Sequence, residues 1–270
     1  MNKSFPIGIF DSGVGGLSVL KKIHTKLPNE SLVYVADSIN APYGPKNNSF
    51  ILDRSISIVD FLVSNHEIKL LVIACNTATA STISKLREIY NFPIIGMEPA
   101  IKPANEASRN NKVGILATEG TFNSSKFSAL LEAYSGKTQF FTQPCIGLVE
   151  YIEYGHIDSS EVISLVHKNL APLLEHNVDV VVLGCTHYIF IKKIVEKFFN
   201  NKITIIETGN AVALQAQRKL KEFNIESDNL NSKHIIYSNS KNSKMNLIIN
   251  SLLEDSGICF DFHSNWNESL

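Results

Sequence analysis

Two of the four cysteines stand where a thiol could do chemistry. Cys75 ends the apolar run "LVIA" and precedes Asn-Thr, whereas Cys185 ends the run "VVLG" and precedes Thr-His. At each place a predicted strand ends and a predicted helix begins, and the N-terminus of a helix favours an anion such as a thiolate. The polar residues that follow the two thiols are Asn76, Thr77, Thr186 and His187.

A thiolate at these positions needs support from its neighbours. A free thiol with a pKa of about 8.5 is only about 3% ionised at pH 7. Lowering that pKa to 7 takes about 2 kcal/mol, and a helix N-terminus supplies only about 0.3–1 kcal/mol. His187 could move a proton to or from Cys185, or it could merely cap a helix. Packing as a small buried hydrophobe is the alternative for both thiols and is the interpretation we give to Cys145 and Cys259.

A carboxylate and a hydroxyl stand at the end of another predicted strand, in "GIFDSGVGGLSV". The glycine-rich turn after Asp11 and Ser12 enters a helix, but its spacing matches neither the dinucleotide pattern nor the phosphate-loop pattern. The motif therefore offers two polar groups beside a backbone that a ligand can approach closely. In the alternative interpretation, Asp11 caps the helix and Ser12 lies in a turn.

Two further loops could present polar groups to the same site. The loop "APYGPK" would present Tyr43 and the backbone of Gly44, although a plain surface turn is an equal alternative. In "ATEGTF", Thr118 and Thr121 follow a strand that resembles the one before Asp11. Glu150 and Glu153 lie three residues apart, so they share one face of a short helix, which is usually a solvated face.

The elements that would position these groups alternate along the whole chain. Continuous apolar strands separated by amphipathic helices, such as 50–64 and 159–175, indicate an α/β protein with parallel sheets covered on both faces. The predicted strands are 6–10, 31–37, 69–74, 92–97, 112–118, 138–143, 178–184, 202–208, 233–238 and 258–262.

The chain also contains an internal similarity. Residues 71–77 align with 181–187, and residues 7–12 align with 113–118. The two spacings are similar, so we expect a duplicated unit: two similar lobes, each a mostly parallel sheet flanked by helices, with the active site in the cleft between them. A crossover at 96–100 and a return at 208–211 would give lobes of residues 1–98 plus 212–270, and 99–211.

The composition of the chain narrows the range of binding partners that we expect. The 270 residues include 25 Lys and Arg against 26 Asp and Glu, without a block of like charges, so neither nucleic acid nor an anionic membrane is an expected partner. No stretch approaches the ~20 apolar residues of a membrane span, and a Pro and an Asp near the N-terminus argue against a signal peptide. Widely spaced cysteines without an export signal indicate reduced thiols in a cytoplasmic protein.

Four motifs in this order, "FDSGVGGLSV", "APYGPK", "ACNTATA" and "LGCTHY", resemble the cofactor-independent glutamate racemases, a branch of the aspartate/glutamate racemases. The resemblance covers nearly the whole chain. It implies an isomerase that interconverts L- and D-glutamate without a cofactor or metal. In that family D-glutamate supplies peptidoglycan synthesis, and hence the cell wall and cell shape.

The resemblance also implies roles for individual residues. Cys75 and Cys185 would be the two acid/base residues, Asp11 and His187 would assist them, and Glu153 matches a glutamate sometimes given a supporting role. The residues that would hold the amino acid are Ser12, Tyr43, Gly44, Asn76, Thr77, Thr118, Thr121 and Thr186.

Three positions depart from the family pattern. Ile189 follows "CTHY" where the family usually has Pro, Glu207 replaces a usual Asp, and "YSNSKNSK" lacks a common Thr-Ser-Gly. The first two lie beyond the acid/base residues, so they put helix entry and local hydrogen bonding in question more than the reaction.

The chemistry also fits the residues themselves. Inverting a stereocentre by proton transfer needs a base on one face of the α-carbon and an acid on the other. Two sulfurs, each about 3–3.5 Å from that carbon, would stand roughly 7 Å apart, which is far beyond disulfide length. We therefore expect reduced thiols that face each other.

Other functions stay open at this stage. An aspartate racemase or a relative acting on another α-substituted acid would differ in pocket length, which the sequence gives poorly. A two-lobed binding protein would hold a ligand without exchanging its α-proton. A phosphate-binding enzyme is disfavoured because Asp11 would repel an anion. A homodimer is one of the assemblies that the sequence leaves open.

Overall fold

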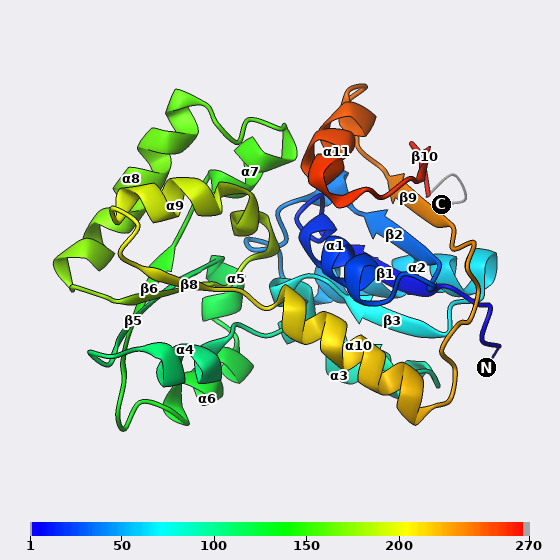
Figure 1. Cartoon of the computed structure of the whole chain (residues 1–270), viewed down its shortest axis with the longest axis horizontal. Coiled ribbons are helices and arrows are strands. Elements are labelled where there is room, and N and C mark those ends of the chain that lie inside the picture. The colour runs from blue at the N-terminus through cyan, green and yellow to red at the C-terminus, as the bar shows by residue number, and fades with distance from the viewer. Residues whose placement is uncertain (1, 267–270) are drawn as a thin grey trace.

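The computed structural model describes residues 2–266, which form two parallel β-sheets with helices on both faces (Figure 1). One sheet and its helices lie on the left of Figure 1, and the other, which carries the first and last strands, lies on the right. The predicted fold class is confirmed, and all ten predicted strands are present.

The first sheet has six strands in the order β10-β9-β2-β1-β3-β4, and every neighbouring pair is parallel. Its two faces are covered by different helices, because alternate side chains of β1 enter separate cores: Ile9 packs with α1, α10 and α11, and Phe10 packs with α2 and α3. The strands are β1 (Ile7–Asp11), β2 (Leu32–Ala36), β3 (Leu70–Ile73), β4 (Ile94–Ile95), β9 (His234–Ser238) and β10 (Asp261–His263).

The second sheet has four strands in the order β6-β5-β7-β8, again all parallel. In Figure 1, α8 and α9 lie above this sheet and α4 and α6 lie below it. The strands are β5 (Lys112–Ala117), β6 (Gln139–Pro144), β7 (Val180–Leu183) and β8 (Thr204–Ile206).

Helices connect successive strands. The two helices predicted at 50–64 and 159–175 are α2 (Asn48–His66) and α8 (Ser160–Glu175). The other α-helices are α1 (Leu17–Lys26), α3 (Asn76–Ile89), α4 (Ile101–Ala107), α5 (Glu119–Phe122), α6 (Ser125–Glu132), α7 (Leu148–Glu153), α9 (Lys192–Phe198), α10 (Gly209–Glu222) and α11 (Met245–Leu253). Three 3₁₀ helices are η1 (Ser38–Asn40), η2 (Thr186–Ile191) and η3 (Glu254–Ser256).

The two sheets repeat one topology. The strand order β2-β1-β3-β4 in the first sheet has the same form as β6-β5-β7-β8 in the second. The similar sequence segments are β1 with β5 and β3 with β7, and these strands occupy matching places in the two orders. This is the arrangement that a duplicated α/β unit predicts.

Two connections join the sheets. The first leaves β4 and enters α4, and the second leaves β8 and enters α10, which packs against α1. Thr208 Oγ1 in the second donates a hydrogen bond to the carbonyl oxygen of Glu98 in the first, at 3.0 Å. Glu207 accepts from the N–H of Gly209 at the start of α10, so this departure from the family pattern caps a helix. We propose residues 1–98 plus 212–270, and 99–211, as the two lobes.

Candidate active site

The predicted site residues meet in one cavity between the two sheets. Together with space open to solvent it contains about 280 Å³ of empty volume, and its walls come from the carboxyl ends of strands in both sheets, where ligands bind in parallel α/β folds. Among the predicted residues, those lining it are Ser12, Tyr43, Gly44, Cys75, Asn76, Thr77, Thr118, Cys185, Thr186 and His187. Pro42, Val149 and Gly184 complete the wall, while Asp11, Thr121 and Glu153 lie behind it.

The Cys75 thiol stands on the side of the first sheet. It is a free cysteine with 6% of its surface exposed. It is the N-cap of α3, as predicted: its Sγ accepts a hydrogen bond from the N–H of Ala78 at 3.4 Å, and it lies 4.0 Å from Ser12 Oγ. Burial raises the pKa of this thiol well above its ordinary value, and the charge of Asp11 raises it further. The Cys75 side of the cavity therefore favours a protonated thiol.

Asp11 is fully buried beside that thiol. Its Oδ2 accepts a hydrogen bond from the N–H of Gly16 at 2.8 Å, but Gly16, not Asp11, is the N-cap of α1. Its Oδ1 has no hydrogen-bond partner among residues 2–266. Burial raises the pKa of this carboxyl, and the charge of His187 opposes that shift only in part.

The second thiol differs from the prediction in one respect. Cys185 precedes the 3₁₀ helix η2 and not an α-helix, and its side chain caps no N–H group. The spacing of three residues places Cys185, Tyr188 and Ile191 together on the buried side, and Tyr188 is held there by a bond from its hydroxyl to the carbonyl oxygen of Cys145 at 3.2 Å. The α-helix, α9, starts only at Lys192.

His187 supplies the charge that an α-helix would have supplied. Cys185 is a free cysteine, 8% exposed, and its Sγ lies 3.8 Å from His187 Nδ1. His187 Nε2 lies 2.6 Å from Glu153 Oε1. Burial lowers the pKa of this imidazole, but the bonds to Cys185 and Glu153 outweigh burial and raise the pKa well above 6.5. A charged imidazolium at this distance stabilises a thiolate.

The interpretation of Glu153 as part of a solvated face is wrong. Glu150 is exposed, but Glu153, at the end of α7, is 8% exposed. Its Oε1 accepts hydrogen bonds from both His187 Nε2 and the N–H of Val14, each at 2.6 Å. Helical spacing places two residues on one face but does not say what covers that face.

The glycine-rich turn accommodates side chains from the second lobe. A Cβ added at Gly15 would overlap the ring of His187 and lie 2.6 Å from Thr186 Oγ1, and one added at Gly13 would overlap the carboxylate of Glu153. The turn therefore has small residues because the assisting pair packs directly against its backbone. This explains why the glycines match no phosphate-binding pattern.

Hydrogen-bond donors that could hold the carboxylate groups of a ligand gather around Thr77. The hydroxyl oxygen of Thr77 on α3 lies 2.8 Å from that of Thr118 and 3.4 Å from that of Thr121, the latter two being 3.1 Å apart. Both amide atoms of Asn76 are buried without a hydrogen-bond partner within the described part of the chain. A buried amide left unpaired is costly, so this one is well placed for a ligand.

The Tyr43 loop closes another side of the cavity. The peptide bond between Ala41 and Pro42 is cis. Tyr43 is buried, and its hydroxyl donates to Asp37 Oδ2 at 2.6 Å. Sequence analysis assigned no role to Asp37, although Tyr43 lies only six residues after it along the chain.

Within residues 2–266, no group of three His, Cys, Asp or Glu side chains is arranged to hold a metal ion. None of the helices in this range combines the length and apolar character of a membrane span.

Comparison with known proteins now identifies the family. The family model for Asp/Glu/hydantoin racemases matches residues 7–216, which include both thiols and every other candidate residue. The chain belongs to the Asp/Glu/hydantoin racemase family.

Within the family, its relatives are glutamate racemases. A glutamate racemase from Pseudomonas paraeruginosa is 49% identical over 219 residues, covering 81% of this chain and 82% of the relative. The structure of glutamate racemase isoform RacE1 from Bacillus anthracis superimposes with a TM-score of 0.87 at 31% identity, covering 98% of each chain. The Escherichia coli glutamate racemase, solved with L-glutamate and the activator UDP-MurNAc-Ala, gives a TM-score of 0.85 at 29% identity, covering 96% of this chain and 97% of that one. The resemblance seen in the sequence is confirmed.

Proposed function

We propose that this racemase interconverts L- and D-glutamate by proton transfer between two thiols. The observation that carries the proposal is that one small cavity is lined by two free, buried thiols, one from each sheet. A two-base racemisation needs such a pair on opposite faces of the α-carbon. The choice of glutamate as the substrate rests on the similarity to the glutamate racemases named above.

The electrostatic difference between the thiols suggests the starting state. Cys185, beside the imidazolium of His187, would be the thiolate, and Cys75, whose pKa is raised by burial and Asp11, would be the thiol. The thiolate takes the α-proton, so the C–H bond breaks and an S–H bond forms. Cys75 then gives its proton to the opposite face of the carbanion. The opposite enantiomer reacts from the reverse protonation state, and no net proton is consumed.

The polar wall fits a dicarboxylic amino acid. The hydroxyls of Thr77 and Thr118 and the amide of Asn76 can donate to carboxylate oxygens, with Thr121 behind them as a hydrogen-bond partner of both hydroxyls. The Ser12 hydroxyl can accept from the ammonium group. Turnover of both glutamate enantiomers, compared with both aspartates, tests the choice of substrate.

The cellular role follows from the proposed reaction. D-glutamate would supply peptidoglycan synthesis, in agreement with the family resemblance. Catalysis by two free thiols requires a reducing compartment, so we propose a cytoplasmic location.

Isotope exchange tests the mechanism. Wild type, Cys75→Ser and Cys185→Ser are each incubated with L- or D-glutamate in deuterated water, and deuterium at the α-carbon is measured. We expect wild type to form the labelled opposite enantiomer and each variant to lose racemisation. A variant that racemises at the wild-type rate rules out the two-thiol mechanism. Glutamate that binds to wild type without α-exchange would show a binding protein instead.

A further inference from the structure

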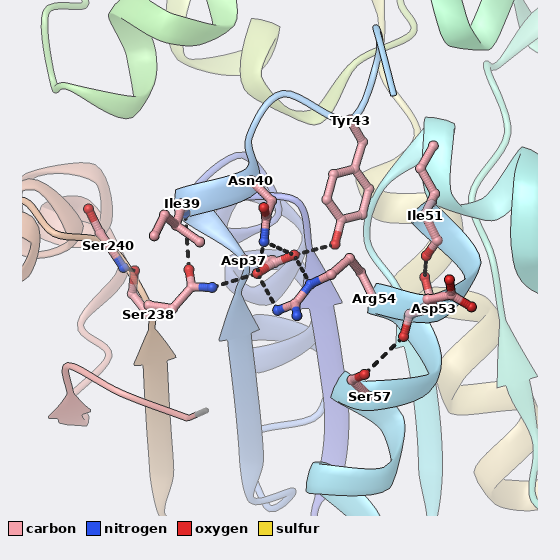
Figure 2. A network of polar contacts seen from close by, with 12 residues as sticks. Asp37, Ile39, Asn40, Tyr43, Ile51, Asp53, Arg54, Ser57, Ser238 and Ser240 are labelled. Carbon is pink, nitrogen blue, oxygen red and sulfur yellow. Dashed lines mark hydrogen bonds and ion pairs between the residues drawn. The ribbon is translucent and has the colours of Figure 1, made fainter. Parts of the chain in front are cut away.

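A second polar cluster, which adjoins the cavity through Tyr43, centres on the carboxylate of Asp37 (Figure 2). Asp37 follows β2 and is fully buried. Four side chains donate hydrogen bonds to its two oxygens: Tyr43 Oη at 2.6 Å, Arg54 Nε and Nη2 at 3.0 and 2.9 Å, Asn40 Nδ2 at 3.0 and 3.1 Å, and Asn239 Nδ2 at 2.6 Å. We call these five residues the Asp37 cluster.

Arg54 balances the charge of the cluster. It lies on α2, and its side chain, 16% exposed, binds both carboxylate oxygens in the bidentate geometry that makes such pairs strong. The bonds to Asp37 raise the pKa of this guanidinium despite its burial. Its charged end also lies 5.0 Å from the ring centre of Trp266. The cluster therefore joins α2 and the segment after β9 to the loop that carries Tyr43, and Arg54 also contacts the segment after β10 through Trp266.

That loop forms part of the substrate cavity. Pro42, Tyr43 and Gly44 all line it. Gly44 also packs against the second lobe: a Cβ added to it would lie 2.9 Å from Thr118 Cβ, and one added to Gly120 would lie 2.6 Å from the carbonyl oxygen of Gly44. Tyr43 of this loop is thus held by Asp37, and the next residue, Gly44, contacts the second lobe.

We propose that Asp37 and Arg54 are positioning residues that hold the Tyr43–Gly44 segment in its substrate-binding position. The inference rests on the proposed function, because it takes the cavity to be the glutamate site. Loss of Arg54 leaves a buried carboxylate without its cation, and such a group either takes up a proton or shifts toward water. Either change weakens the bond from Tyr43 and lets the loop shift.

Because Pro42, Tyr43 and Gly44 line the cavity, the loop would contact the amino acid both before and during the reaction, so its displacement should weaken the binding of substrate and transition state alike. Such a loss of uniform binding raises KM and leaves kcat nearly unchanged. For Arg54→Met we expect KM to rise about tenfold with kcat within about twofold of wild type. Arg54→Lys keeps the charge but loses the bidentate geometry, and should recover part of the KM increase.

Asp37→Asn is a stronger change, because an amide NH₂ would face donors where the carboxylate only accepts. We expect it to raise KM at least as much as Arg54→Met. The matched controls are Asp53→Asn, one residue before Arg54 but exposed, and Arg218→Lys, exposed on α10. Both should keep wild-type KM and kcat. Thermal unfolding of every variant identifies any that has lost its fold.

A double-mutant cycle separates loop positioning from general damage. Tyr43→Phe removes the bond to Asp37 that Arg54→Met is expected to weaken, so the effects of these two substitutions on KM should not add. Additive effects, an unchanged KM in folded Arg54→Met, or equal losses in the controls would overturn the inference. Failure of the proposed function is a separate result, since wild type itself would then not racemise glutamate.

Discussion

The bond between Glu153 and His187 allows a quantitative test of the site. Replacing Glu153 by Gln keeps the size of the side chain and an oxygen that can accept from His187 Nε2 and from the N–H of Val14, both now at 2.6 Å. What is lost is the negative charge. Burial lowers the pKa of His187, and the hydrogen bond and charge of Glu153 raise it. Removal of the charge therefore lowers this pKa.

The size of the effect follows from the population of imidazolium. Above the pKa of His187, each unit by which that pKa falls makes the imidazolium fraction tenfold smaller, so kcat/KM at pH 8 should fall by roughly tenfold. The loss should shrink as the pH falls, because the imidazolium is then restored. The sign is that of a group with a raised folded-state pKa: its charged form dominates below that pKa and is lost above it.

The assay is kcat/KM for each glutamate enantiomer between pH 6 and 9. Glu150→Gln, three residues earlier on α7 and exposed, is the matched control and should follow the wild-type profile within about twofold, as expected of an exposed surface substitution. An equal loss for Glu153→Gln at every pH, or no loss at pH 8, would refute the role given to the His187 charge.

Three other substitutions follow from the same geometry. Asp11→Asn should raise the Tm at pH 7–8, because Asp11 has a raised pKa and its ionised form is costly when buried. The gain in Tm should vanish as the pH falls toward 3.8. Calorimetry measures it, and each kcal/mol of stability gained corresponds to roughly 2 °C. Gly15→Ala should lower kcat/KM by roughly 100-fold by displacing His187, since a shift of about 1 Å can cost that much, while circular dichroism stays unchanged. Lys69→Met leaves the buried carboxylate of Glu30, now 2.6 Å from the Lys69 ammonium, without its cation, which should cost about 3–5 kcal/mol; the double variant with Glu30→Met should recover most of this stability in urea unfolding.

The sequence predicted the elements well because their signals are local. Continuous apolar runs and helical periodicity are properties of a few neighbouring residues, and all ten strands follow from them. The paired thiols were predictable because each follows a strand of a duplicated unit, and the parallel topology then brings both to one cavity.

The supporting contacts could not be predicted because their partners are distant in the chain. Glu153 bonds to Val14, 139 residues away, and Asn239 bonds to Asp37, 202 residues away. The 3₁₀ helix after Cys185 depends on the burial of Tyr188 by the second lobe, which the short segment itself does not reveal. In each case tertiary contacts decide what local propensity leaves open.

The order of strands in the first sheet has a consequence for synthesis on the ribosome. All four strands of the second sheet lie between residues 112 and 206, so that sheet can assemble while the chain is still being made. The first sheet needs β9, which pairs with β2, and β10, which pairs with β9, and both are made after all the other strands in the described residues. Asn239 is made after β9, and Trp266 is made after β10. A nascent chain therefore carries both thiols long before Asn239 can bond to Asp37, so the Tyr43 loop gains this support only after β9 has been made.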